Sequence, residues 1–158
     1  MIPEIREERG IPTLYVNEKP FFIRGGEIHN SSASSLEYMA EKVWPALREL
    51  HMNTVIVPVY WETVEAEEGS YDWKLVDGLI DQAKNEGMHL VFLWFGLWKN
   101  AESMYIPGWM KKNPDLYFHA VKRNGEPLET VSPFCEAAVE KDADAFANLM
   151  IHIREKDE

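Results

Sequence analysis

Polar and aromatic residues collect directly after three apolar runs of the chain. They are Glu27, His29 and Asn30 after the first run, Tyr60, Trp61, Glu62 and Glu65 after the second, and Trp94, Trp98, Lys99 and Asn100 with the third. In α/β proteins the carboxyl ends of the strands meet at one edge of the sheet, and ligands bind there. Flat rings that also form hydrogen bonds suit the faces of sugars as well as they suit a protein core. The pattern therefore predicts a polar and aromatic ligand site at that edge.

A structural interpretation competes with this functional one. Glu27 and His29 can act as hydrogen-bonding groups at the end of a strand, and Trp61 and Trp98 can cover the core. For the acidic residues after the second run, the structural interpretation is a solvated loop. These residues are Glu65, Glu67 and Glu68.

The elements that would position these residues begin with a hairpin. Residues 13–16 and 21–24 are β-prone runs around a turn-forming set at 17–20, which predicts two antiparallel strands. The second run is expected to continue as the first core strand, over residues 21–28. The near-continuous apolar stretch at 53–60 is typical of a strand that is buried on both faces in a parallel sheet.

A third apolar strand is expected at 89–95, and Pro58 predicts weaker pairing near the end of the second strand. The segment 96–131 is expected to hold one helical turn near Trp109 and a hairpin at 124–125, where Asn is followed by Gly.

Three helices are expected between and after the strands. The first begins with a capping box at Ser34 and Glu37, runs to residue 50 and kinks at Pro45, which has no backbone N–H. The second has Asp72 as its N-cap and ends at Gly87. Its apolar stripe is Leu75, Val76, Leu79, Ile80 and Ala83. The third is capped by Ser132, begins at Pro133 and turns inward Val139, Ala143, Phe146, Met150 and Ile153.

The order β, α, β, α, β, long loop, α predicts an α/β architecture. Strand starts near residues 22, 54 and 89 are close to the roughly 31 residues per unit of an eight-unit barrel. The first turn, with Glu27 directly after Gly25 and Gly26, lacks the fingerprint of an open nucleotide-binding sheet, because a carboxylate would stand where a pyrophosphate binds.

Charge and composition limit the partners. The chain has 158 residues, and 16 Lys and Arg against 27 Asp and Glu give a net charge of −11, which repels nucleic-acid phosphates and anionic membranes. The first twenty residues contain no apolar signal segment, so a cytoplasmic location is favoured. The single cysteine, Cys135, excludes an internal disulfide and a cysteine-based zinc site.

Four stretches of the sequence carry a specific resemblance. They are PFFIRGGEIHN, LRELHMNTVIVPVYWETVEAEEGSYDW, GMHLVFLWFGLWKN and IPGWMKKNPDLY. Together they resemble the opening half of the barrels of glycoside hydrolase families 35 and 42, which include β-galactosidases, and the resemblance covers residues 13 to 155. It implies that residues 1–158 form a single domain, a short hairpin followed by the first three β/α units of an incomplete (β/α)₈ barrel.

The resemblance also implies a chemistry and a set of sugar contacts. Such enzymes hydrolyse terminal β-linked sugars with two carboxylates and without a metal or organic cofactor. Both carboxylates are expected beyond Glu158, so no residue of this chain is expected to be catalytic. The residues implied to bind the terminal sugar are Glu27, His29, Trp61, Glu62, Trp98, Lys99 and Asn100. The family-35 pattern usually has asparagine at the position of Glu62 and an acidic residue near Asn100, and these departures leave the exact sugar open.

Two other function classes remain open from the sequence. A metal-dependent hydrolase would use Glu27, His29 and His89, but His89 begins its strand at the opposite end from His29. A noncatalytic carbohydrate-binding remnant, or a truncated reading frame without activity, would keep the sugar contacts or none of them. Open sheet edges further predict self-association.

Overall fold

The structure is a computed structural model that describes residues 2–100 and 104–157. In chain order the elements are β1 (Glu4–Glu8), β2 (Ile11–Val16), β3 (Lys19–Pro20), β4 (Gly25–Glu27), a 3₁₀ turn (Ser32–Ser34), α1 (Leu36–Tyr38), a π-helical turn (Met39–Val43), α2 (Trp44–Glu49), β5 (Thr54–Tyr60), α3 (Trp61–Val64), α4 (Lys74–Glu86), β6 (His89–Phe95), α5 (Gly108–Lys111), β7 (His119–Val121), β8 (Pro127–Val131) and α6 (Glu136–Lys156). This order confirms the expected α/β class. Among the described residues, no helix is long and apolar enough to cross a membrane.

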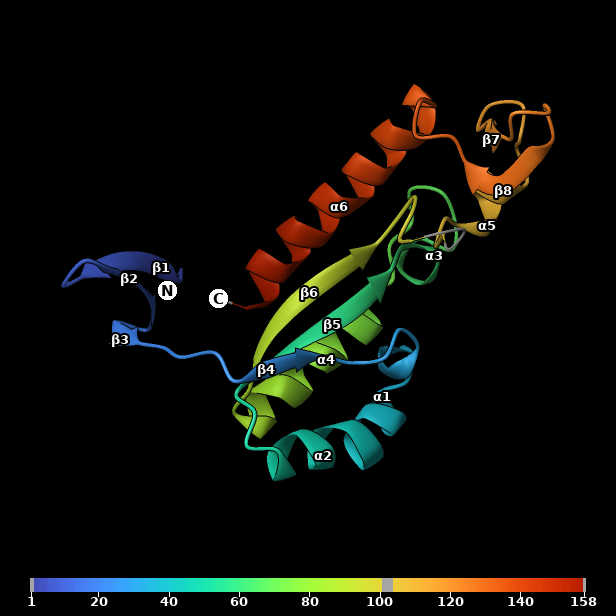
Figure 1. Cartoon of the computed structure of the whole chain (residues 1–158). Helices are drawn as coiled ribbons and strands as arrows, with labels where there is room; N and C mark the ends of the chain where they lie inside the picture. The colour runs from blue at the N-terminus through green and yellow to red at the C-terminus, as the bar shows by residue number, and fades with distance from the viewer. Residues whose placement is uncertain (1, 101–103, 158) are drawn as a thin grey trace.

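A three-stranded parallel sheet, in the order β4-β5-β6, lies at the centre of the chain (Figure 1). Strands β5 and β6 have the bounds that their apolar runs predict to within one residue, and their register continues unbroken from Thr54 opposite His89 to Tyr60 opposite Phe95. Helix α4 lies behind β5 in Figure 1, and α6 runs alongside β6. The carboxyl ends of β5 and β6 therefore meet at one edge, as the sequence predicts.

Burial differs between the two long strands. Every residue of β5 is buried except the half-buried Ile56, whereas β6 has exposed residues such as Val91 (48% exposed). Within the described part of the chain, β6 pairs with β5 alone and is an edge strand. Pro58 does not interrupt the pairing with β6, but pairing with β4 ends before it, at Ile56. The weakening expected at Pro58 is thus seen on one side only.

The first core strand is shorter than residues 21–28, because a side chain takes over part of its ladder. Asn53 accepts from the backbone N–H of Arg24 through Oδ1 (2.8 Å) and donates through Nδ2 to the carbonyl of Phe22 (2.9 Å). Phe21 instead donates its backbone N–H to Leu14, in the N-terminal sheet. Only β4 remains paired with β5.

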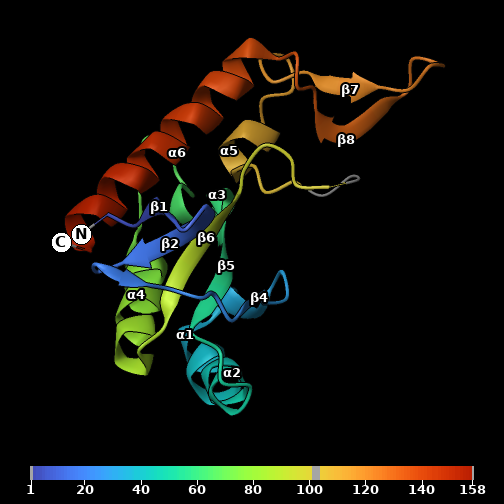
Figure 2. The same cartoon turned by 60° about the vertical axis from the view of Figure 1, so that its left-hand side comes forward.

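The N-terminal residues form an antiparallel sheet, β1-β2-β3, which lies apart from the parallel sheet in Figure 1 and comes in front of it in the turned view of Figure 2. A hairpin is present here as expected, but its second strand is β3 and not residues 21–24, because Asn17 and Glu18 both take positive φ (51° and 62°) and form a two-residue turn. Strand β1 was not expected. Its sequence is charged and its residues are mostly exposed, so it has no apolar alternation to reveal it.

The first helix is divided where the sequence predicts a kink. Before Pro45 the helix widens into the π-helical turn, in which Trp44 donates its backbone N–H to the carbonyl of Met39, five residues back. Because Pro45 has no backbone N–H, one hydrogen bond of a regular α-helix cannot form there. The wider π-helical turn accommodates this missing bond. The cap is Ser35 and not Ser34: its hydroxyl accepts from the backbone N–H of Tyr38 (3.2 Å).

Helix α4 begins and ends close to expectation. Gly87 ends it in the left-handed conformation (φ 66°). Asp72 does bind a free N–H of the first turn, that of Lys74 at 3.0 Å, although Trp73 occupies the N-cap position. The helical turn near Trp109 and the hairpin around Gly125 are also confirmed, as α5 and the β7–β8 pair.

Helix α6 starts three residues later than expected. Ser132 accepts from the backbone N–H of Phe134 through its hydroxyl and from that of Cys135 through its carbonyl (3.2 and 3.0 Å). These bonds make a separate turn, and the helix begins only at Glu136, after Cys135 in an extended conformation.

The inward face of α6 was also predicted wrongly. The buried residues are Ala138, Ala145 and Leu149, whereas Phe146 and Met150 are 44% and 49% exposed. Small side chains let the helix approach the sheet closely. Of the larger apolar residues that the periodicity favoured, Ile153 is half-buried against the core, and Phe146 lies at the margin of the buried face, where its ring contacts Trp94.

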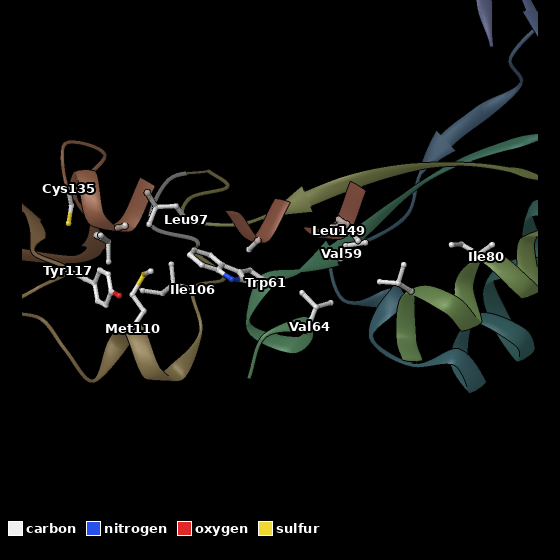
Figure 3. Close-up of a cluster of buried hydrophobic side chains, with 14 residues drawn as sticks. Val59, Trp61, Val64, Ile80, Leu97, Ile106, Met110, Tyr117, Cys135 and Leu149 are labelled. Atoms are coloured by element: carbon white, nitrogen blue, oxygen red, sulfur yellow. The ribbon is translucent and has the colours of Figure 1, made fainter. Parts of the chain in front are cut away.

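Two buried clusters hold the sheet to its helices. One packs Val55 and Val57 against Met39, Trp44 and Leu79 on the helices after β4 and β5. The other is centred on Trp61, with Ile106 and Met110 on one side and Val59 and Val64 on the other (Figure 3). Both clusters consist of apolar side chains that are buried away from water, and such burial is the main favourable contribution to folding stability.

The face of α6 can be tested with two neighbouring substitutions. Leu149→Ala should lower the free energy of unfolding by about 2–5 kcal/mol, because it leaves a cavity in the core. Met150→Ala, one residue along but half exposed, should cost under about 1 kcal/mol. Urea denaturation measures both. A larger loss for Met150→Ala would mean that the helix is rotated.

Candidate functional site

Three aromatic rings pack together where β5 and β6 end. Tyr60 closes β5, Phe95 closes β6, and Tyr105 follows from the next segment. Their ring centroids are 5.8 Å (Tyr60 to Phe95), 5.7 Å (Tyr60 to Tyr105) and 4.8 Å (Phe95 to Tyr105) apart. Tyr60 and Phe95 stand opposite each other in the register, so parallel pairing itself brings these rings together.

The Tyr60 hydroxyl connects this ring group to the first strand. It donates to the backbone carbonyl of Asn30 (2.5 Å). Burial, and secondarily the neighbouring Tyr105, raises the pKa of Tyr60 to about 12. The hydroxyl therefore stays protonated at neutral pH and remains a donor.

A lysine that follows β6 contacts the same asparagine. Lys99 Nζ donates to Asn30 Oδ1 (2.6 Å) and lies 4.4 Å from the centroid of the Phe95 ring. The ammonium has three N–H donors and the Asn30 amide has two, so the pair has more donors than this one bond uses. Tyr60 and Phe95 are buried, so the pair forms a group of donors over buried rings at the carboxyl edge, with the half-buried Tyr105 beside it.

Two expected site residues of the first strand do not join this group by any described contact. Glu27 pairs with Ile56 in the middle of β5, so it stands on the face of the sheet and not at its edge, and its side chain is exposed. His29 is exposed as well, with Nδ1 3.2 Å from the hydroxyl of Ser31.

Trp61 is placed differently from the expectation. Its side chain is fully buried, and its indole N–H donates to Glu65 Oε2 (2.6 Å). It has no exposed surface with which to contact a sugar, and the structural interpretation of a core residue holds for it.

Glu65 is likewise buried (3% exposed), so it does not belong to a solvated loop. Besides Trp61, it accepts from the backbone N–H of Gly69 through Oε1 (2.8 Å), and its carbonyl accepts from the Trp109 indole (3.0 Å). Glu67 and Glu68 are exposed, as expected, and Glu68 pairs with Lys141 (2.7 Å).

The remaining expected residues lie at the surface. Glu62 forms an ion pair with Lys111 (3.1 Å), and its backbone N–H donates to Tyr105. Trp98 is 57% exposed, and Asn100 is exposed.

The site as folded therefore differs from the expected set. Asn30 and Tyr60 were recognised as strand-end residues without being assigned to the site, and Phe95 and Tyr105 were not recognised at all. The register of two parallel strands of equal length could have identified Phe95 as the neighbour of Tyr60. No local signal marks Tyr105.

Metal-binding geometry is not found in the part of the chain that the structure describes: no group of three or more His, Cys, Asp or Glu side chains could hold an ion. His89 packs edge-on against Phe21 (4.9 Å between centroids), at the start of β6. The donors at the carboxyl edge, with the half-buried Tyr105 ring beside them, suit a neutral ligand with many hydroxyl groups.

Comparison with known proteins gives three findings. Residues 13–149 match glycosyl hydrolases family 35. β-Galactosidase 14 of Arabidopsis thaliana is 28% identical over 126 residues, which are 74% of this chain and 13% of that protein. The solved structure of exo-β-1,4-mannosidase Op5Man5 from Opitutaceae bacterium strain TAV5 superposes with a TM-score of 0.55 at 19% identity, over 85% of this chain and 22% of that one.

These findings carry different weight. The structural likeness, at its low identity, concerns the fold alone: the chain shares an α/β arrangement with structural neighbours that are TIM-barrel glycosidases. The chain spans only a small part of either relative's length. The family match, in contrast, extends over most of the chain and includes all three parallel strands. The chain therefore belongs to glycosyl hydrolases family 35.

Proposed function

We propose that the chain contributes the first three β/α units of a (β/α)₈ barrel in a β-galactosidase-like enzyme, and that the edge where Asn30 and Lys99 meet, beside the half-buried Tyr105, binds the terminal sugar. The buried rings of Tyr60 and Phe95 support this edge and do not themselves contact the sugar. The observation that carries the proposal is the Lys99–Asn30 contact across the carboxyl edge, because this is where barrel enzymes bind their substrates. Trp98, Asn100, Glu62, His29 and Glu27 are proposed as outer contacts. Trp61 is left out, since it is buried.

The hydrolytic step needs two carboxyl groups about 5–5.5 Å apart if configuration is retained. One donates a proton to the leaving oxygen, and the other attacks the anomeric carbon. The glutamates after β5 have other partners: Glu62 pairs with Lys111, and Glu65 is bonded to Trp61 and Gly69. We therefore propose that both catalytic carboxylates come from barrel strands outside residues 1–158, and that the chemistry requires no metal or organic cofactor.

A noncatalytic carbohydrate-binding role is the second candidate. The contacts of Glu62 and Glu65 with other residues favour this role as well. With these two carboxylates occupied, the chain has sugar contacts but no acid–base pair of its own. Binding and hydrolysis, measured separately, distinguish the two.

Lys99→Met tests sugar binding. It keeps the unbranched apolar part of the side chain and removes the charged donor, so the dissociation constant for methyl β-galactoside should rise about tenfold, as expected for a hydrogen bond from a charged group. NMR titration of the aromatic signals measures it.

Lys84→Met is the matched control, because Lys84 pairs with Asp157 at the far end of α4. It should leave the affinity unchanged. Equal affinities for the Lys99→Met variant and the unchanged chain would remove Lys99 from the site.

Hydrolysis is tested on the 158-residue chain with a nitrophenyl β-galactoside. We expect no turnover above that of buffer. Turnover that disappears in Glu27→Gln or Glu62→Gln would show that a catalytic carboxylate lies within the chain, which would refute this part of the proposal.

We also propose that the chain alone associates with itself through β6, whose outer edge and exposed Val91 would adjoin a further strand in a closed barrel. Light scattering after size exclusion should give a mass above that of one chain. Val91→Lys should shift the protein toward monomer, because a charge on an edge strand opposes pairing. Val121→Lys, on the β7–β8 hairpin, should not. A monomer at every concentration of the unchanged chain would contradict the proposal.

A further inference from the structure

One carboxylate on α6 holds the end of β6. Asp142 accepts from the indole N–H of Trp94 through Oδ1 (2.7 Å) and from the backbone N–H of Leu97 through Oδ2 (3.1 Å). One oxygen thus binds a residue near the end of β6, and the other binds the residue that follows Gly96. A neutral side chain of the same shape offers only one such acceptor.

The backbone is shaped to admit this carboxylate. Gly96 lies between the two bonded residues, and a Cβ atom there would overlap both Asp142 and the Trp94 indole nitrogen. Only glycine leaves the space that the carboxylate fills. Ala138 and Ala145, both fully buried, bring α6 close enough for Asp142 to reach it.

The segment held in this way carries the donors of the sugar edge. Leu97 is two residues before Lys99, whose ammonium binds Asn30. The carbonyl of Gly96 accepts from the backbone N–H of Tyr105 (3.1 Å), and the Tyr105 ring packs on Phe95. A shift of Leu97 would therefore move both the ammonium and one ring of the site.

We infer that Asp142 is a positioning residue: through the N–H of Leu97 and the space at Gly96, it fixes the segment that places Lys99 against Asn30. Its value for sugar binding rests on the proposed function. Its effect on Lys99 does not, and it can be measured without a sugar.

The two bonds of Asp142 can be separated. Trp94→Phe removes the indole donor but leaves the bond to Leu97, so it lowers stability without releasing the segment. Asp142→Ala and Asp142→Leu both remove the bond to Leu97, because neither side chain has an acceptor, and the second keeps the branched shape of the side chain. Asp144→Ala, on the same helix with an exposed side chain, is the control for substitution on α6.

The readout is the rate at which an acetylating reagent modifies Lys99, measured by mass spectrometry relative to Lys112. In both Asp142 variants this rate should rise about fivefold, the change expected when the restraint of one hydrogen bond is lost. It should remain that of the unchanged chain in Trp94→Phe and Asp144→Ala. If Asp142→Ala does not fold, Asp142→Leu decides.

An unchanged rate in Asp142→Leu, or an equal rise in Trp94→Phe, would overturn the inference. The affinity for methyl β-galactoside is measured on the same variants and should fall in the Asp142 variants alone. If the unchanged chain binds no sugar, the proposed function fails, and the acetylation rates still decide the role of Asp142.

Discussion

Parallel pairing of β5 with β6 is the constraint on which the rest of the structure depends. The pairing is continuous over both strands, so the residues that end them, Tyr60 and Phe95, stand side by side. Burial of β5 on both faces requires helices against the sheet, and these follow each strand in turn. The connections make all three strands run in the same direction, so the segments that follow β4 and β6 emerge at the same edge of the sheet. Asn30 and Lys99 therefore meet there, although 69 positions separate them in the sequence. Local sequence alone would not bring them together.

The sequence predicts those parts of the fold that depend on continuous apolar runs and on backbone chemistry. Strands β5 and β6, the end of α4 at Gly87 and the disturbance before Pro45 are of this kind, and the structure has all of them. The face of α6 was predicted wrongly because periodicity favours large apolar side chains, whereas close contact with the sheet required alanine. Strand β1 was missed because an exposed, charged strand has no apolar alternation.

The sequence predicts where the candidate site lies better than it predicts which residues form it. Residue types after the strands indicated the carboxyl edge, and Lys99 lies there. Whether a tryptophan near that edge faces a ligand or the core depends on its neighbours, and Trp61 turns inward because buried Glu65 accepts its indole N–H. Tyr105 enters the site from a distant segment through backbone bonds to Gly96 and Glu62, which no pattern of residue types specifies.

The central claim is that a terminal sugar binds at the Asn30–Lys99 edge. The most direct measurement is a crystal structure of the chain grown with methyl β-galactoside. The account predicts density for the sugar against the Lys99 ammonium and the Asn30 amide, with an apolar face of the sugar toward the half-buried Tyr105 ring. Density for the sugar at another surface, such as the groove of Lys84, Met88 and Ile153 between α4 and α6, with the Lys99–Asn30 edge empty, would contradict it.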